Sequence, residues 1–229
     1  MKGGDKIIHQ IWVGKYNIPQ REIRFSNEVK EKHPTYEYKL WTDNNLPEIP
    51  TQFQEMYNIM YNNRHYVNCA DILRWLVVYK YGGWYLDIDF EFIQNLDVLN
   101  LDHRNGIVFG HWGDGWQHCD YTVTNNVFGF EKENSLVKHM IDTMPIELNY
   151  GNGPHSPGWT GIAVKNYLGL ENEFSKEIWE YHRVMRENLD KYNVEYGDYN
   201  GFMSNNLRHH ALYSNAPENI LKFERGEML

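Results

Sequence analysis

The chain has 229 residues, a formal net charge of −9 and 15% aromatic residues. This length fits one large domain or two small ones, and the aromatic content is typical of a globular protein with a packed core. A negative charge without a Lys/Arg run argues against a nucleic-acid partner, because a phosphate backbone requires a basic surface. No segment is long and apolar enough for a transmembrane helix, and no signal-peptide pattern is present. We therefore expect a cytoplasmic protein.

The first half of the chain predicts two strands followed by a helix and a third strand. Residues 6–14, KIIHQIWVG, form a compact apolar run that predicts a buried strand ending at Trp12. After a polar, helix-like stretch, residues 35–43 alternate and predict a second strand. From Tyr66 apolar side chains recur at helical intervals until a glycine pair, which is a common helix end. Residues 84–92, WYLDIDFEF, alternate and predict one continuous strand.

The second half predicts shorter elements and no boundary between domains. Strands are expected at 106–111 and 126–130, and helices at 135–144 and 161–170. Beyond residue 170 the chain is polar and aromatic, without a periodicity that assigns an element. Because strands alternate with helices and no linker or repeat is present, we predict one α/β domain over residues 1–229.

Asp87 and Asp89 are the first candidates for chemistry. In a continuous strand both carboxylates would face the same way, with Cβ atoms about 7 Å apart, while Ile88 points into the core. Two carboxylates at a strand end can share Mg²⁺ or Mn²⁺, which keeps positions for water or phosphate oxygens. A metal that bridges a diphosphate neutralises it as a leaving group. Alternatively, these acids and Glu91 form only the wetted edge of a half-exposed strand.

The predicted helix before this strand carries a second pair of charged residues. Asp71 and Arg74 are three positions apart and therefore neighbours on one helical face. One interpretation is a surface ion pair that contributes little to stability. The other is an acid that binds hydroxyls beside a base that faces an anion. The tight turn at Gly82-Gly83 delivers both to the same strand end as the acids.

Three motifs match a known family in order and spacing. They are IIHQIWVG at 7–14, ADILRWLVVYKYGGWYLDIDFEF at 70–92 and HHALYSN at 209–215. The chain thereby resembles the DXD-containing sugar transferases of glycosyltransferase family 32. That family includes fungal initiating α-1,6-mannosyltransferases, bacterial capsular-sugar transferases and, more distantly, glucosyltransferase domains of clostridial toxins. The resemblance implies a GT-A type fold with a mixed central sheet flanked by helices.

The resemblance also implies roles for individual residues. Trp12 matches the aromatic residue that stacks on the nucleotide base, and Asp89 matches the direct metal ligand. The implied donor-binding residues are Trp12, Asp71, Arg74, Tyr85, Asp87, Asn126 and Ser214. The implied metal ligands are Asp87, Asp89 and His210, and the implied catalytic residues are Asp87, Asp89 and Arg74.

The C-terminal segment departs from the family pattern. Relatives end in an H-H-W-x-x-S-W-like segment that closes over the diphosphate, whereas Ala211 and Asn215 stand here in place of the two tryptophans. Residues 200–229 are nevertheless expected to form a C-terminal lid of this kind.

The expected activity is metal-dependent transfer of a hexosyl unit, with retention of configuration, from a nucleoside diphosphate sugar to a hydroxyl of a glycan or glycolipid. The expected cofactor is Mn²⁺ or Mg²⁺. A UDP-sugar is the favoured donor and GDP-mannose the second candidate. Because no anchor is evident, a bacterial or viral source is favoured over the Golgi.

Two other functions are compatible with parts of the sequence. A haloacid-dehalogenase-type phosphatase also has an apolar strand ending in D-x-D, but it requires Thr or Val where Phe90 and Glu91 stand. A non-catalytic carbohydrate-binding module would use surface aromatic residues without a metal.

Overall fold

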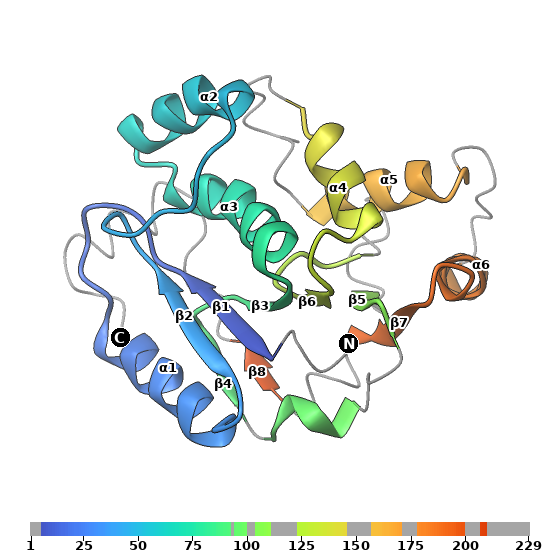
Figure 1. Cartoon of the computed structure of the whole chain (residues 1–229), viewed down its shortest axis with the longest axis horizontal. Helices are drawn as coiled ribbons and strands as arrows, with labels where there is room; N and C mark the ends of the chain where they lie inside the picture. The colour runs from blue at the N-terminus through green and yellow to red at the C-terminus, as the bar shows by residue number, and fades with distance from the viewer. Residues whose placement is uncertain are drawn as a thin grey trace.

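A computed structural model describes residues 6–92, 94–99, 104–110, 123–145, 157–170, 178–199 and 207–209. A six-stranded sheet with the order β2-β1-β3-β6-β5-β7 forms its centre (Figure 1). These strands are β1 (Ile7–Ile11), β2 (Glu37–Trp41), β3 (Gly83–Leu86), β5 (Gly106–Gly110), β6 (Val127–Phe130) and β7 (Val194–Asp198). A second, two-stranded sheet consists of β4 (Phe90–Phe92) and β8 (Leu207–His209).

The central sheet is mixed. β1 pairs in parallel with β2 and β3, and β5 pairs in parallel with β7. β6 is antiparallel to both of its neighbours, β3 and β5. The carboxyl ends of β1 and β3 therefore meet at one edge of the sheet, where the predicted site residues follow them in the sequence. A mixed central sheet of the α/β class is what the sequence predicts.

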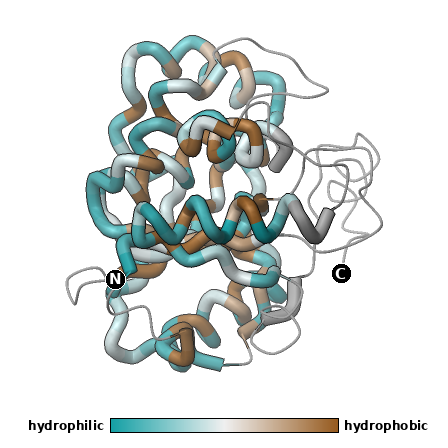
Figure 2. Tube along the Cα trace, turned by 90° about the vertical axis from the view of Figure 1, so that its right-hand side faces the viewer, coloured by the Kyte–Doolittle hydropathy of each residue, from teal (hydrophilic) through white to brown (hydrophobic). Residues whose placement is uncertain are grey.

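Helices cover the sheet on both sides (Figure 1). α3 packs on β1, β3 and β6, and α2 and α4 pack on α3, whereas α1 lies on the other side against β4. Figure 2 shows hydrophobic and hydrophilic segments alternating along the tube, as expected for helices at the surface that bury one face. The helices are α1 (Gln20–Lys32), α2 (Thr51–Asn62), α3 (Tyr66–Tyr81), α4 (Ser135–Asp142), α5 (Pro157–Tyr167) and α6 (Ile178–Asp190), with a 3₁₀ turn at Leu96–Leu99.

Steric constraints explain why two glycines stand between α3 and β3. Gly82 and Gly83 both have positive φ, at 68° and 93°. A Cβ atom on Gly83 would lie 2.4 Å from the carbonyl oxygen of Ile7. Only glycine therefore allows the chain to leave α3 and pair at once with β1, which brings α3 and the end of β3 to the same place.

The predicted continuous strand over residues 84–92 is wrong. β3 ends at Leu86, residues 87–89 form a turn in which Phe90 N donates to the Asp87 carbonyl at 3.4 Å, and β4 then pairs with β8. The chain leaves the central sheet because Phe90 and Phe92 bury their side chains in a cluster with Val29 of α1. Strand alternation consequently does not set the directions of the acids, and we call residues 87–89 the acidic turn.

His9 is fully buried in β1 and is held as a neutral ring. Its Nδ1 accepts a hydrogen bond from Trp41 Nε1 at 3.1 Å, and its Nε2 donates to the Gly82 carbonyl at 2.9 Å. Burial lowers the pKa of His9 from 6.5 to about 4. The neutral form is therefore the one that the folded protein accommodates.

This burial predicts a loss of stability in mild acid. Because the folded pKa lies below the unfolded value, the contribution of His9 is complete above pH 6.5 and is lost as the pH falls toward 4. Between pH 7 and pH 4.5 we expect His9 to account for about 2–3 kcal/mol of the lost free energy of unfolding. Urea unfolding at both pH values would show a smaller loss in His9→Gln than in wild type. The same pH dependence in His9→Gln as in wild type would contradict this account.

Candidate active site

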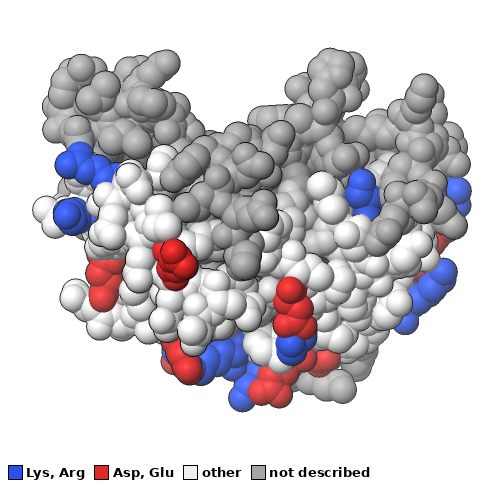
Figure 3. All heavy atoms as spheres, turned by 90° about the horizontal axis from the view of Figure 1, so that it is seen from above, with Lys and Arg blue, Asp and Glu red and all other residues white. Residues whose placement is uncertain are grey.

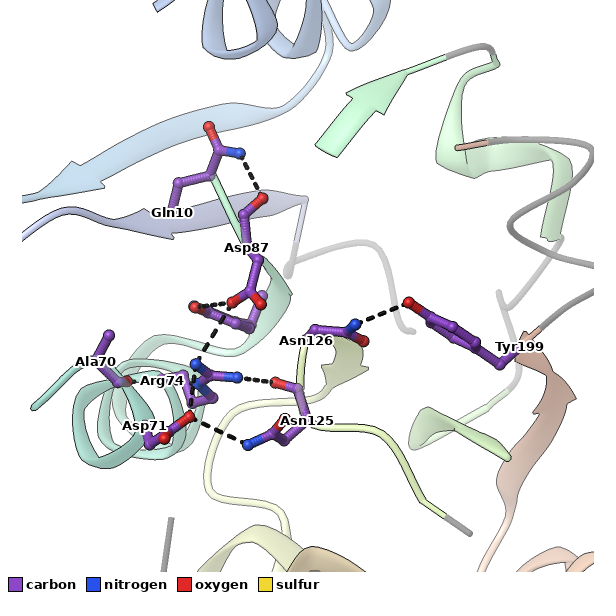
Figure 4. A network of polar contacts seen from close by, with 9 residues as sticks. Gln10, Ala70, Asp71, Arg74, Asp87, Asn125, Asn126 and Tyr199 are labelled. Carbon is purple, nitrogen blue, oxygen red and sulfur yellow. Dashed lines mark hydrogen bonds and ion pairs between the residues drawn. The ribbon is translucent and has the colours of Figure 1, made fainter. Parts of the chain in front are cut away.

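Polar side chains from several segments meet at the carboxyl edge of β1 and β3 (Figure 4). α3 contributes Asp71 and Arg74, and the acidic turn contributes Asp87. The residues just before β6 contribute Asn125 and Asn126, which we call the asparagine pair. Tyr199, the residue after β7, reaches the pair from the far side.

Arg74 is the centre of this network. Its side chain is almost fully buried, and Nη2 lies 2.7 Å from Asp71 Oδ1 and 3.4 Å from Asp87 Oδ1. Nη1 donates to the Asn125 carbonyl at 2.5 Å, and the guanidinium lies 4.7 Å from the centroid of the Tyr85 ring. Burial works against the cation, but Asp71, Tyr85, Asp87 and Asp89 together raise the pKa of Arg74. Arg74 is therefore a fixed positive charge that joins two carboxylates.

Asp71 is a buried carboxylate, and the surface-pair interpretation of it is excluded. Only 7% of the residue is exposed, and Oδ1 also accepts a hydrogen bond from Asn125 Nδ2 at 3.1 Å. The pKa of Asp71 is raised to about 7: burial raises it most, Asp87 adds to this, and Arg74 and the Asn125 hydrogen bond partly oppose it. Without Arg74 this group would be a neutral acid at pH 7.

Asp87 is held at its backbone and at its side chain. Its amide donates to the Asn126 carbonyl at 2.9 Å, which extends the β3–β6 ladder by one residue, and its carbonyl accepts from Gln10 Nε2 at 3.2 Å. Oδ1 accepts a hydrogen bond from the Tyr85 hydroxyl at 2.5 Å. Burial raises the pKa of Tyr85, so its hydroxyl stays protonated and donates.

Sequence reasoning missed two residues of this network, Gln10 and Tyr199. Gln10 is fully buried in β1, and its Oε1 accepts hydrogen bonds from Ser26 Oγ at 3.0 Å and from the Tyr38 hydroxyl at 2.8 Å. An amide inside an apolar strand is the sequence signal for Gln10, because a buried amide requires partners. Tyr199 lies where the sequence assigns no element.

The structure describes some of the other predicted site residues and not the rest. Trp12 follows β1 at the same sheet edge and is half-buried, with Nε1 donating to the Tyr16 carbonyl at 2.8 Å. Asp89 lies buried in the acidic turn. His210 and Ser214 lie outside the described residues, as does the predicted lid at 200–229 apart from β8.

β8 nevertheless brings the C-terminal segment back to the acidic turn. In the antiparallel pairing of β4 with β8, His209 lies opposite Phe90, the residue that follows Asp89. The described part of β8 thus ends beside the acidic turn, and the sequence continues from there to His210.

The acidic turn offers the type of ligand atom that a hard divalent cation prefers. Asp87 and Asp89 offer carboxylate oxygens, which Mg²⁺ and Mn²⁺ prefer, and such ions complete their shell with water and phosphate oxygens. Within the described ranges, no three His, Cys, Asp or Glu side chains are grouped so that they could hold a metal. Among the described residues, the carboxylates of the acidic turn are thus candidate ligands and not a complete metal site.

The face of the molecule above α2, α3 and α4 has no broad basic field among the described residues. Figure 3 shows its Lys, Arg, Asp and Glu side chains singly or in small groups of mixed sign.

A mixed α/β sheet with an acidic turn after a central strand and an Asp–Arg pair from the preceding helix defines a candidate sugar transferase. The family model described as "Glycosyltransferase sugar-binding region containing DXD motif" matches residues 19–105, which include α3 and the acidic turn. The chain contains this glycosyltransferase region, and the resemblance to DXD-containing sugar transferases is confirmed.

Two curated relatives illustrate the similarity. Inositol phosphoceramide mannosyltransferase 3 of Schizosaccharomyces pombe is 32% identical over 61% of this chain and 37% of its own length. Initiation-specific alpha-1,6-mannosyltransferase of Candida albicans is 22% identical over 77% of this chain and 52% of its own length. The chain thus spans about half or less of the curated relatives that it matches here.

A solved structure supports the fold. The PaToxG glycosyltransferase superposes with a TM-score of 0.58 at 17% identity, over 82% of this chain and 79% of that chain. The fold is that of a GT-A type glycosyltransferase, as the sequence predicts.

The expectation of a cytoplasmic protein from a bacterium or virus is wrong. Both mannosyltransferase relatives, and a mannosyl phosphorylinositol ceramide synthase of Saccharomyces cerevisiae that also matches, are fungal proteins. The expectation rested on the lack of an evident anchor in this stretch of sequence, and such a lack does not locate a protein. Across the part of the chain that the structure describes, none of the helices has both the length and the hydropathy to span a bilayer.

Proposed function

We propose that this chain transfers a hexosyl unit from a nucleoside diphosphate sugar to a hydroxyl of a glycan or glycolipid, with retention of configuration and with a divalent metal bound at the acidic turn. The observation that carries the proposal is the Asp71–Arg74–Asp87 network, which joins the helix α3 to the acidic turn. Asp71 and Arg74 are buried and Asp87 is partly buried. Burying charged groups is costly, and such a constellation in a sugar-binding region is best explained by a charged ligand.

Each charged residue has a proposed role at the diphosphate. Asp87 and Asp89, with His210 from the C-terminal segment, would hold Mn²⁺ or Mg²⁺. When bound, that ion supplies positive charge that stabilises the departing diphosphate. Arg74 Nη2 contacts both Asp71 and Asp87 and so fixes both carboxylates; we therefore assign to Arg74 the orientation of these groups as well as attraction of the anion. We assign to Asp71 the binding of hydroxyl groups of the donor, and to Trp12 stacking on the nucleotide base.

The proposed reaction needs no protein nucleophile. The bond between the anomeric carbon and the leaving phosphate oxygen breaks, and a bond to the acceptor oxygen forms on the same face of the sugar. The acceptor proton passes to an oxygen of the leaving diphosphate. The contribution of this chain is to hold donor and acceptor in register, with binding energy on the unreactive nucleotide fixing the reacting carbon.

Mannose is the first sugar to test. The names of two relatives describe them as mannosyltransferases, and one of these names gives inositol phosphoceramide, a phosphorylated glycolipid precursor, as the molecule acted on. GDP-mannose is therefore the first donor to test, and UDP-glucose, UDP-galactose and UDP-N-acetylglucosamine are tested for comparison.

A donor-turnover assay tests the proposal. With Mn²⁺ and each donor in turn, release of the nucleoside diphosphate is measured with and without α-mannosides or inositol phospholipids as acceptors. Turnover of one donor, stimulated by an acceptor, is the expected result. Absence of turnover with phosphate release from p-nitrophenyl phosphate would favour the phosphatase, and metal-independent glycan binding without nucleotide affinity would favour the binding module.

A further inference from the structure

The asparagine pair connects three parts of the molecule. Asn125 joins α3, since its carbonyl accepts from Arg74 and its side chain donates to Asp71. Asn126 joins the acidic turn, because its carbonyl accepts the amide of Asp87. A shift of this segment would therefore move the charged network and the backbone of the acidic turn together.

Tyr199, which follows β7, connects the asparagine pair to the β7 end of the sheet. Its hydroxyl accepts a hydrogen bond from Asn126 Nδ2 at 2.8 Å, across 73 positions of sequence (Figure 4). The residue is only 8% exposed, and its ring packs in the core cluster that contains Trp84, Leu86 and Phe90. The ring thus anchors the hydroxyl on the same elements that begin and end the acidic turn.

The Asn126 side chain depends on this contact. Its Oδ1 atom is buried and has no hydrogen-bond partner among the described residues. Tyr199 is therefore the described partner that orients this amide. A buried amide oxygen without a partner is costly, which is understandable where a ligand hydroxyl supplies the missing hydrogen bond.

We propose that Tyr199 is a positioning residue for sugar transfer. Its hydroxyl fixes the side-chain amide of Asn126, so that Oδ1 is presented to a hydroxyl of the donor sugar and the backbone carbonyl of Asn126, which accepts the Asp87 N–H, is held in place. The expected effect of Tyr199 on turnover rests on the proposed function. The expected effect of Tyr199 on the position of Asp87 rests on the structure alone.

Tyr199→Phe tests the proposal, because it removes the hydroxyl and keeps the ring. We expect kcat/KM for the donor sugar to fall about tenfold, the effect of one lost hydrogen bond in a closed site. Affinity for the nucleoside diphosphate alone should fall by less than kcat/KM for the donor sugar, since that ligand lacks the sugar hydroxyl that Oδ1 would bind. Tyr196→Phe is the matched control. Tyr196 is also a buried tyrosine and lies in β7, but its hydroxyl contacts His182 Nδ1 at 2.7 Å and not the asparagine pair. The Tyr196→Phe substitution should therefore leave kcat/KM unchanged.

Two further measurements separate positioning from general support. In a double-mutant cycle with Asn126→Ala, the double variant should be no slower than Asn126→Ala alone, because both changes break the same link. Hydrogen exchange at the Asp87 amide, read by NMR, should be faster in Tyr199→Phe and unchanged in Tyr196→Phe. Exchange does not require turnover, so it tests the positioning of Asp87 even if the proposed function fails.

The proposal is overturned by unchanged Asp87 exchange, by additive effects in the cycle, or by equal losses of donor-sugar turnover and nucleoside diphosphate affinity. An inactive wild type would instead count against the proposed function, and the exchange result would still decide whether Tyr199 positions Asp87.

Discussion

Replacing Arg74 with methionine is expected to abolish sugar transfer and to lower the free energy of unfolding by about 3–5 kcal/mol at pH 7. Methionine fills much of the volume of the arginine stem but removes the cation that lies 2.7 Å from Asp71 and 3.4 Å from Asp87. Without this cation, Asp71 would have to take up a proton to remain buried, and Asp87 would lose its ion pair. The loss is measured by urea unfolding, and transfer by release of the nucleoside diphosphate.

The pH dependence of the same variant identifies the cause. With Arg74 gone, burial and Asp87 both raise the pKa of Asp71, which is already about 7 with Arg74 present. An acid whose folded pKa exceeds its unfolded value destabilises the fold increasingly as the pH rises between the two values. The gap in stability between Arg74→Met and wild type should therefore narrow from pH 7 to pH 5.

An exposed arginine provides the control for Arg74. Arg104 forms ion pairs with Asp190 and Glu195, but its side chain is 32% exposed, so Arg104→Met should cost less than about 1 kcal/mol. Adding Asp71→Asn to Arg74→Met should restore part of the stability but no transfer. Arg74→Met that is as stable and active as Arg104→Met would show that the network is neither structural nor functional.

Substituting Asp89 with asparagine is expected to reduce transfer by at least about 100-fold at saturating donor, because a neutral amide is a poorer ligand for a hard cation than a carboxylate. Asparagine has nearly the same shape, so the buried turn should keep its fold. A titration with MnCl₂ should show that more metal is needed to reach half of the remaining activity.

Glu91→Gln is the matched control for Asp89→Asn. Glu91 belongs to the same acidic run but lies in β4, half-buried, beyond the turn. Its substitution should leave transfer within about twofold of wild type. Equal losses in both variants would mean that general negative charge, and not a ligand at Asp89, is what the reaction requires.

The strands and helices of the first half could be predicted from the sequence because their patterns are strong and local. β1, β2 and α3 lie where periodicity and the glycine pair indicate, and β5, β6, α4 and α5 are likewise found near their predicted ranges. α2, α6 and β7 were not predicted. The strand predicted over 84–92 breaks because pairing with β8, a tertiary contact of a distant segment, takes over from the central sheet at Phe90.

The candidate site was partly predictable for the same reason. Asp71 and Arg74 are neighbours by helical spacing, and the glycine turn indicates that they meet the acids. Their burial is explained by α3 being apolar on almost all sides, which marks a helix covered on every face. The link from Tyr199 to Asn126 has no local signal, because it joins residues 73 positions apart.

The most direct test of metal-dependent donor binding is calorimetry of the wild-type protein with GDP-mannose and the UDP-sugars, first with Mn²⁺ and then with a chelator. The proposed function predicts that one donor binds with Mn²⁺, and that this binding is lost with chelator and in Asp89→Asn but kept in Glu91→Gln. Donor binding that is equally strong with chelator, or no binding of any donor with Mn²⁺, would contradict a metal-assisted sugar transferase.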